Sequence, residues 1–364
     1  MKKKMMAMVL GVVLSMSLMA CGSSETAEEV SSDSSTEETE DAESETEGET
    51  ASSRIIDDTD RTMDYETGIA RQKMEIVPKS EGEDITIGFA CVMNDSMTYL
   101  FEAVETFDEE NDDISITLVD TEGDISLEMS TIENFINMEV DAIILVPTDS
   151  TACDQISLKC TEAGIPIICT NSGMEAACWT MVGSDQYYAG QLQGEWLAEN
   201  TDGTGNYCIV LGDLSNEASY ARTNGVVDTL EEMAPEMNLL AQDDCGWMRD
   251  SAMEIAENWL NSDFADDINY IVSNNDEGAI GAAIACEAAG RDDILILGVD
   301  GLAAGLQYMD KGMLDFTVFQ NVTAQGTTAC ETAVKVIRGE DVDTYIDVPM
   351  EPVTMENYKS YKTE

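Results

Sequence analysis

The sequence predicts an α/β fold of two lobes, each a parallel β-sheet flanked by helices. Three observations favour this fold. From Asp84 onwards, short apolar runs alternate with amphipathic stretches, which is the pattern of strands and helices in α/β proteins. Several runs are β-branched and apolar throughout, as strands buried on both faces require. The runs are too numerous for one sheet of ordinary width, so we expect two sheets in two lobes.

The apolar runs are the expected strands. They are residues 85–91, 114–120, 141–147, 166–171, 179–184, 206–213, 269–275, 294–300 and 315–320. The stretches between them predict helices. Gly164 and Gly290 stand where helices commonly end in a left-handed residue. After Asp124, four apolar side chains fall on one helical face: Met129, Ile132, Phe135 and Ile136.

The first 20 residues predict a secretion signal. Three lysines at positions 2–4 precede an uncharged apolar run that is short for a bilayer span. The run ends in Leu-Met-Ala-Cys-Gly at 18–22, which resembles the lipobox of bacterial lipoproteins. We therefore expect residues 1–20 to be a lipoprotein signal peptide and Cys21 to carry the lipid, outside the cytoplasmic membrane. The alternative is an ordinary signal peptide that happens to end near a cysteine.

Residues 21–53 are acidic, rich in Ser and Thr, and contain neither basic nor aromatic residues. Such a segment cannot bury enough apolar area to offset its ordering entropy, so we expect a disordered tether. As a flexible coil it would span roughly 30 Å, and repulsion between like charges would extend it. Residues 54–83 are less polar but show no clean period. They are expected to be an extension whose order the sequence does not predict.

The charge excludes several classes of function. The chain has 17 Lys plus Arg against 74 Asp plus Glu, no His, and a formal net charge of −57. A polyanionic surface repels nucleic acid, which we exclude as a partner. Without imidazole, neither a Ser-His-Asp triad nor a His-ligated catalytic zinc can be built. The acidic run at 108–113 lacks the central Gly and terminal Glu of an EF-hand, so no metal is expected.

Polar residues follow most of the expected strands, and ligands of open parallel sheets bind beyond the carboxyl ends of strands. Amides and carboxylates dominate these positions, with Trp247 and Arg249 near another strand end. This set suits a polyhydroxylated neutral ligand, because each hydroxyl donates and accepts and an aromatic face packs on C–H groups. Phosphate would need Gly-rich loops or several cations, which are lacking.

The chain from about Asp84 to Glu340 resembles the type 1 periplasmic binding proteins for sugars, which deliver ligands to ABC importers or chemoreceptors. The matching blocks, in order, are STIENFINMEVDAIILVPTDS, AGIPIICTNS, VGSDQYYAGQLQGEWLAE, the segment 222–225, SNNDEGAIGAA, ILGVDGLAAGLQYMDKGMLDFTVFQ and VIRGE. The resemblance implies two lobes joined by three crossings of the chain. It places 84–184 and 321–345 in the N-terminal lobe, and 185–320 and 346–364 in the C-terminal lobe.

The resemblance also implies ligand contacts. Asn275 in NNDEG, Asp300 in GVDG and Gln320 at the end of DFTVFQ match polar contacts of the family. Trp247 and Arg249 in CGWMRD match an aromatic and arginine pair.

Other contact positions depart from the family pattern. Asn171 stands where an acid is frequent, and Ser172 and Tyr220 stand where arginines are frequent. The first loop, NDSMTYL, lacks the usual Pro-Phe-Phe and offers instead Asp95, Ser96 and Tyr99. The departures leave the ligand open between a hexose, a disaccharide and a nucleoside-like molecule.

Several of these residues have simpler interpretations. Asn275 and Asp300 could cap helices or turns, as strand-end Asn and Asp residues usually do. Arg249 could pair with one of the many acids. The other tryptophans, at 179, 196 and 259, have apolar neighbours and are expected in the core.

Cysteine use suggests a reducing or anaerobic habitat. Nine cysteines remain beside Cys21, none in a C-x-x-C pair, and Cys91, Cys169 and Cys208 fall inside apolar strands. An oxidising habitat would favour disulfides in an exported protein. A metal site or nucleophilic cysteine lacks a supporting His.

The sequence thus predicts a monomeric, lipid-anchored protein without catalytic activity or cofactor that binds a sugar for an ABC importer. The alternative is a module that presents a sugar or nucleoside-like ligand to a membrane receptor. A hydrolase using paired carboxylates is a third hypothesis. The export signal and the lack of a DNA-binding segment argue against a transcription repressor of the same architecture.

Overall fold

The computed structural model describes residues 69–94 and 96–362, in which two six-stranded sheets form the cores of two lobes. The first sheet is parallel throughout, in the order β11-β5-β4-β3-β1-β2. Its strands are β1 (Ile85–Cys91), β2 (Ile114–Asp120), β3 (Ala142–Leu145), β4 (Ile167–Asn171), β5 (Thr180–Gly183) and β11 (Tyr345–Asp347). We call this sheet and its helices the first lobe.

The second sheet, with its helices, forms the second lobe. Its order is β12-β10-β9-β8-β6-β7, and all pairs are parallel except β10 with β12. The strands are β6 (Thr204–Leu211), β7 (Glu236–Asp244), β8 (Tyr270–Ser273), β9 (Leu295–Leu297), β10 (Phe316–Phe319) and β12 (Glu351–Thr354). The predicted α/β fold of two lobes with parallel sheets is therefore confirmed.

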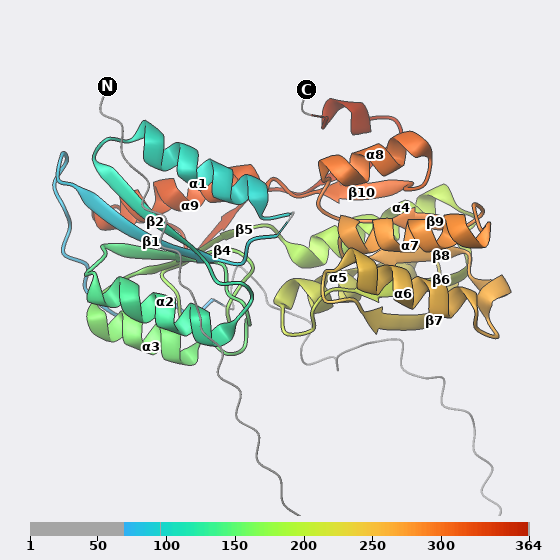
Figure 1. Cartoon of the computed structure of the whole chain (residues 1–364), viewed down its shortest axis with the longest axis horizontal. Coiled ribbons are helices and arrows are strands. Elements are labelled where there is room, and N and C mark those ends of the chain that lie inside the picture. Colours follow the sequence, from blue (N-terminus) through green and yellow to red (C-terminus); the bar gives the residue numbers. More distant parts are fainter. Residues whose placement is uncertain (1–68, 95, 363–364) are drawn as a thin grey trace, which may run out of the picture. The chain divides into compact units, whose positions relative to one another are not determined.

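Helices cover both faces of each sheet (Figure 1). In the first lobe, α1 (Thr98–Glu110) and α9 (Val322–Ile337) lie on one face, and α2 (Ile125–Asn137) and α3 (Asp154–Ala163) on the other. In the second lobe, α4 (Gln186–Asn200) and α5 (Glu217–Met233) lie opposite α6 (Arg249–Leu260), α7 (Asp276–Ala289) and α8 (Ala303–Lys311). Among the described residues, no helix has the length and apolar character of a membrane span.

All nine predicted runs form strands. Residues of β6 show why the runs are apolar throughout: Tyr207 and Ile209 pack against α4 and α5, whereas Cys208 and Val210 pack against α6 and α7. Gly164 and Gly290 end α3 and α7 in the left-handed conformation, as expected. Three strands were not predicted, namely β7, β11 and β12.

Three crossings of the chain join the lobes. They lie between β5 and α4, between β10 and α9, and between β11 and β12. The first and third crossings are tied together, because the hydroxyl of Ser184 donates to the carbonyl of Val348 (2.5 Å). The backbone N–H of Val348 in turn donates to the carbonyl of Gly183 (2.7 Å). The exact residues that divide the lobes remain a prediction.

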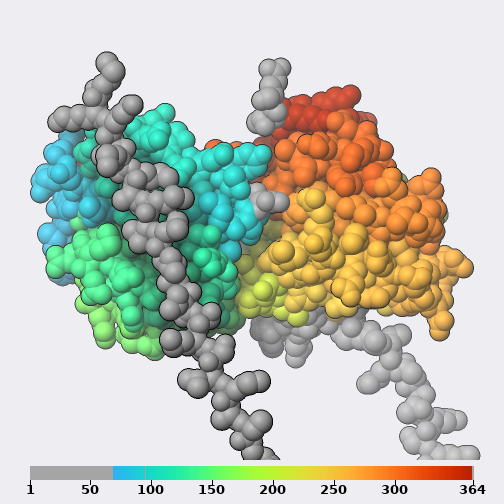
Figure 2. All heavy atoms as spheres, viewed as in Figure 1, coloured from blue at the N-terminus to red at the C-terminus, as the bar shows by residue number. Residues whose placement is uncertain are grey.

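Segments at both ends of the described chain pack onto the lobes. In the extension, Gln72 is 4% exposed, accepts from the backbone N–H of Ile167 (2.8 Å) and donates to the hydroxyl of Thr161 (3.1 Å). Residues 69–83 thus contribute to the first lobe without a regular helix or strand. The C-terminal segment, red in Figure 2, lies against the orange α8, where Tyr358 donates to Asp310 (2.8 Å).

Helices α4 and α5 touch through glycines. A Cβ added to Gly190 would lie 1.9 Å from the carbonyl oxygen of Arg222, and one added to Gly225 would lie 2.2 Å from that of Tyr187. Side chains at these positions would therefore force the two helices apart. The close contact fixes the position of Arg222 relative to α4.

The nine cysteines within 69–94 and 96–362 are all free and buried. Burial raises the pKa of every one of these thiols, to about 12 for Cys153, Cys160, Cys178, Cys208 and Cys330. The thiolate is the reactive form, so both burial and protonation suppress their chemistry. They serve as small apolar side chains of the core.

We therefore expect the folded protein to be inert to thiol reagents. In a chain carrying Cys21→Ser, Ellman's reagent at pH 8 should release almost no thionitrobenzoate before unfolding and nine equivalents in 6 M guanidinium chloride. The reaction rate under native conditions should follow the rate of unfolding. Fast modification of even one thiol in the native protein would contradict the burial seen here.

Candidate ligand site

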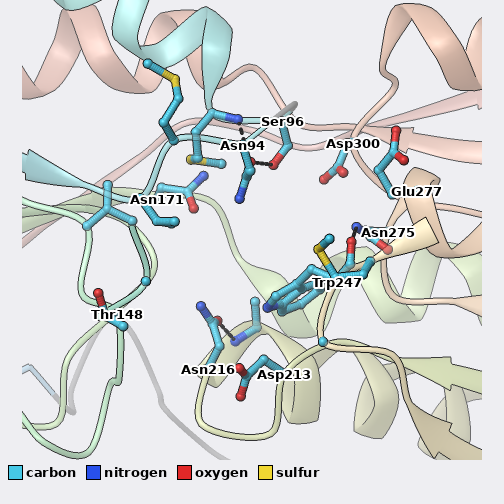
Figure 3. Close-up of a pocket in the computed structure, with 18 of the residues that line it drawn as sticks. Asn94, Ser96, Thr148, Asn171, Asp213, Asn216, Trp247, Asn275, Glu277 and Asp300 are labelled. Carbon is cyan, nitrogen blue, oxygen red and sulfur yellow. Dashed lines mark hydrogen bonds between the residues drawn. The ribbon is translucent and has the colours of Figure 1, made fainter. Parts of the chain in front are cut away.

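Polar side chains at the carboxyl ends of both sheets line a cavity of about 740 Å³. In Figure 3, Thr148 and Asn171 of the first lobe lie across the cavity from Trp247, Asn275 and Glu277 of the second. Most of the predicted contact residues line it: Ser96, Asn171, Trp247, Arg249, Asn275, Asp300 and Gln320. These residues come from distant parts of the chain and meet here because the carboxyl ends of parallel strands lie at the same edge of a sheet.

Three predicted contacts do not line the cavity. Tyr99 lies on the first turn of α1 with 37% of its surface exposed. Ser172 is buried and donates its hydroxyl hydrogen to Asn216 (3.1 Å). Tyr220 is half-buried on α5. Two further predicted residues, Asp95 and Cys21, lie outside the described residues.

Arg222 forms the floor of the cavity and is 4% exposed. Its Nε donates to Gln186 Oε1 (2.9 Å), its Nη1 to the carbonyl of Asn274 (2.5 Å) and its Nη2 to Gln320 Oε1 (2.7 Å). Nη1 also lies 3.7 Å from Asp300 Oδ1. The planar guanidinium thereby fixes the two side chains that follow β9 and β10.

Asp300 and Gln320 each keep one unsatisfied atom. Within the described residues, Asp300 Oδ2 and Gln320 Nε2 are buried and have no hydrogen-bond partner. One is an acceptor and the other a donor, and both side chains line the cavity. Such atoms cost free energy until a partner arrives, typically about 1–3 kcal/mol each. A ligand hydroxyl, which donates and accepts, has the complementary chemistry.

The charge of Asp300 is set by its surroundings. Burial raises the pKa of its carboxyl from 3.8 to about 7, with Arg222 opposing the shift and Glu277 adding to it. Burial also raises the pKa of Asp276 well above its usual value, and the nearby Asp300 contributes. Asp276 accepts from the backbone N–H of Leu302 (2.8 Å) and the hydroxyl of Thr317 (2.6 Å). The two carboxyls therefore resist being charged together.

Trp247 supplies an aromatic wall beside this floor. A Cβ on Gly212 would lie 2.2 Å from its ring, so the absence of a side chain at 212 makes room for the indole. The carbonyl of Trp247 accepts from Asn275 Nδ2 (3.2 Å). Asn275 also caps α7 by accepting from the N–H of Gly278 (2.9 Å). Asn275 is thus both a helix cap, the simpler interpretation of this residue, and part of the cavity lining.

The remaining charged groups of the cavity are mostly acidic. Arg249 makes a two-point pair with Glu277, through Nε to Oε2 (2.7 Å) and Nη2 to Oε1 (2.6 Å), as the simpler interpretation of Arg249 allowed. Three further carboxylates line the cavity, those of Glu122, Asp213 and Asp250. Carboxylates outnumber guanidinium groups, which disfavours an anionic ligand. No group of side chains suited to a metal ion occurs among the described residues.

Backbone strain is concentrated at the cavity. Five non-glycine residues in the described chain have positive φ, and four of them line the cavity: Glu122 (52°), Asn171 (65°), Trp247 (65°) and Asp300 (123°). Side chains disfavour this region by a cost on the order of 1–3 kcal/mol. The concentration of strain at one place supports a functional role for the cavity.

Several lining residues were not predicted as contacts. Arg222 lies inside a helix, so a search for polar residues at strand ends does not find it. It was noted only as the start of a block in the family resemblance. Asn216 caps α5 by accepting from the N–H of Ala218 (2.9 Å), and Glu277 follows the Asn275 cap. The apolar members Met93, Met97 and Met248 carry no polar signal.

Comparisons with known proteins agree with the geometry. Residues 56–341 match the model of the family described as periplasmic binding protein domain. The chain belongs to the periplasmic binding protein family. A Rhizobium meliloti relative, named as a candidate rhizopine-binding protein, is 31% identical over 76% of this chain and 92% of its own length. The xylitol-binding protein of Mycolicibacterium smegmatis is 30% identical over 70% of this chain and 73% of its own.

Solved structures of periplasmic binding proteins share both lobes. A solute-binding protein of an ABC transporter from Bacillus halodurans, solved with myo-inositol, is 35% identical with a TM-score of 0.73. The match covers 78% of this chain and 99% of that one. Another from Actinobacillus succinogenes, solved with D-allose, is 27% identical with a TM-score of 0.71, covering 76% and 100% of the two chains. Membership in this family places the protein outside the cytoplasmic membrane.

The raised pKa of Asp300 predicts a pH-dependent stability. Between about pH 4 and pH 7 the folded state holds a proton that the unfolded state has lost, so the free energy of unfolding should fall as pH rises through this window. The Asp300→Asn side chain cannot titrate, and it also removes the negative charge that raises the pKa of Asp276. In urea unfolding at pH 4.5, 6 and 8, the variant should show a shallower fall and gain stability over the native chain at pH 8.

Asp292→Asn is the matched control, because Asp292 is exposed in the turn before β9. It should keep the pH dependence of the native protein. Equal slopes for Asp300→Asn and the native protein would show that Asp300 is charged throughout this range.

Proposed function

We propose that the protein captures a neutral polyhydroxylated small molecule, a sugar or polyol, and delivers it to an ABC importer. The observation that carries the proposal is the pair of unsatisfied atoms Asp300 Oδ2 and Gln320 Nε2, whose side chains line the same cavity as Trp247. An acceptor and a donor side by side suit hydroxyl groups, and the indole suits the C–H face of a sugar ring. Excess carboxylate argues against phosphorylated or acidic ligands.

The names of relatives support the same class of ligand. Xylitol and ribose stand in the names of two relatives, and myo-inositol and D-allose were bound in two solved structures. All four are uncharged and carry several hydroxyls. The family consists of binding proteins, which supports capture of the ligand without turnover.

The first test is a ligand panel read by thermal shift and then by calorimetry. It should contain monosaccharides, xylitol, myo-inositol, disaccharides, nucleosides and, as negative members, sugar phosphates and uronic acids. A true ligand raises the melting temperature as its concentration rises. At a hundredfold excess over Kd it adds about 2.7 kcal/mol to the free energy of unfolding. A response confined to the acidic members would contradict the proposal.

A second test concerns Asp300. At pH 8, above the raised pKa of Asp300, hydrogen bonds to its charged carboxylate contribute about 1.5–3 kcal/mol, so Asp300→Ala should weaken binding of the panel's best ligand at least tenfold. Stability at neutral pH should change little or rise, because the buried carboxylate is lost together with its desolvation cost. Asp292→Ala, the exposed control, should change neither quantity. A loss of stability with unchanged affinity would reduce Asp300 to a structural role.

We further propose that a lipid on Cys21 anchors the protein, that 21–53 is its tether, and that a monomer meets the permease. Cys21 lies outside the described residues, and the proposal rests on the lipobox resemblance. Cys21→Ser should release the protein from the membrane or leave an unprocessed precursor, as detected by fractionation and intact mass. Affinity of the purified variant should be unchanged. A mature variant still bound to membranes would contradict this anchor.

A further inference from the structure

Asn274 is a buried polar residue that does not line the ligand cavity but contacts the residues that support it. It follows β8 and is fully buried. Its Oδ1 accepts from the backbone N–H of Gly212 (3.0 Å) and from the hydroxyl of Ser219 (3.2 Å). Its Nδ2 donates to the hydroxyl oxygen of Thr223 (3.2 Å). A buried amide with three partners holds them in one arrangement.

Gly212 is the residue on which the indole of Trp247 lies. β6 ends at Leu211, so the N–H that Asn274 accepts belongs to the first residue beyond the strand. A Cβ on Gly212 would lie 2.2 Å from an atom of the indole, which shows how directly the ring lies on this residue. The ring points into the cavity (Figure 3). The position of Gly212 therefore decides where the ring meets a ligand.

The other two partners of Asn274 lie on the helix that carries the floor of the cavity. Ser219 and Thr223 belong to α5, and Thr223 is the residue next to Arg222. The guanidinium carbon of Arg222 lies 5.8 Å from the centre of the Trp247 ring. The amide of Asn274 thus ties the residue under the ring to the helix of the guanidinium.

The hydrogen bonds of Arg222 do not use this amide. Nη1 donates to the backbone carbonyl of Asn274, which any residue at 274 would supply, and Nε and Nη2 donate to Gln186 and Gln320. Loss of the Asn274 side chain would therefore release the support of the indole and leave the guanidinium bonded.

We propose that Asn274 is a positioning residue of the ligand site, whose amide holds Gly212 against α5 and thereby fixes the indole of Trp247 against the bound ligand. This inference rests on the proposed function and adds to it a residue that sets affinity without touching the ligand. A purely structural amide would change stability alone. An aromatic contact changes affinity by about twofold to tenfold, which is the range we expect for loss of the amide.

The first measurement needs no ligand. Asn274→Leu keeps the approximate size of the side chain and removes its hydrogen bonds. The fluorescence of Trp247 is the difference between a protein and its Trp247→Phe variant, taken for the native chain and for Asn274→Leu. In Asn274→Leu this signal should shift to the red and be quenched more strongly by acrylamide. Asn274→Asp keeps an acceptor for Gly212 and should restore the native quenching.

The second measurement is a double-mutant cycle in calorimetry with the full chain. The probe is whichever of D-ribose, xylitol, myo-inositol and D-allose binds the native protein most tightly. Asn274→Leu should weaken binding about threefold to tenfold. In a Trp247→Ala chain the same substitution should weaken it less than about twofold, because the ring through which it acts is gone.

Gln193→Met is the matched control. Gln193 is fully buried on α4, does not line the cavity, and donates to the carbonyls of Ser273 (2.9 Å) and Gly298 (3.1 Å). Its replacement also removes a buried amide, so it should lower the free energy of unfolding. The Trp247 signal and the affinity should stay native.

Two results overturn the inference and leave the proposed function standing. They are native quenching of Trp247 in Asn274→Leu, and equal losses of affinity in the native and Trp247→Ala chains. If Asn274→Leu does not fold, Asn274→Ala replaces it, because it removes the same bonds without adding an apolar branch. Failure of both to fold would make Asn274 a core residue and also overturn the inference. If none of the four probes binds at millimolar concentration, the proposed function fails, whereas the quenching still decides whether Asn274 holds the ring.

Discussion

The buried guanidinium of Arg222 is the interaction on which the site depends. Its hydrogen bonds reach Gln186, just beyond the first crossing, Gln320, just before the second, and the carbonyl of Asn274 after β8. A charge at 4% exposure is tolerated only when its donors are satisfied, so these partners cannot move independently. The same group lies beside Asp300. One side chain therefore joins the ligand floor to two of the three connections between the lobes.

The sequence predicted the strands well where burial on both faces made them apolar throughout. It did not predict β7, β11 and β12, because these strands obey weaker constraints. β7 lies at the edge of its sheet and keeps exposed Glu236 and Asp244 at its ends, so its pattern is polar. β11 and β12 are also edge strands and have only three and four residues. Only one of their seven residues is buried, so neither forms the apolar run that marked the predicted strands.

The site was predictable to the extent that position at a strand end determines it. Asn171, Asp300 and Gln320 satisfy that rule, but the rule gives no side-chain direction, and Ser172 turns instead to Asn216. Arg222 could not be found this way, because it lies inside α5 and reaches the strand ends only through the packing of that helix. The methionines that line the cavity, Met93, Met97 and Met248, could not be predicted from polarity either, because in the sequence they resemble core residues. Three-dimensional packing decided all of these placements.

Because its nine described thiols are free and buried, the protein needs no oxidation to fold, but its unfolded molecules are sensitive to oxidation. No bond between sulfurs holds the described part of the chain, so folding waits on neither an oxidant nor an isomerase. Each unfolding event, however, exposes nine nucleophiles at once, and in an oxidising medium they can cross-link before the chain refolds. Lifetime outside the cell then depends on how rarely the protein opens. Air would form disulfides in this protein through its unfolded molecules alone.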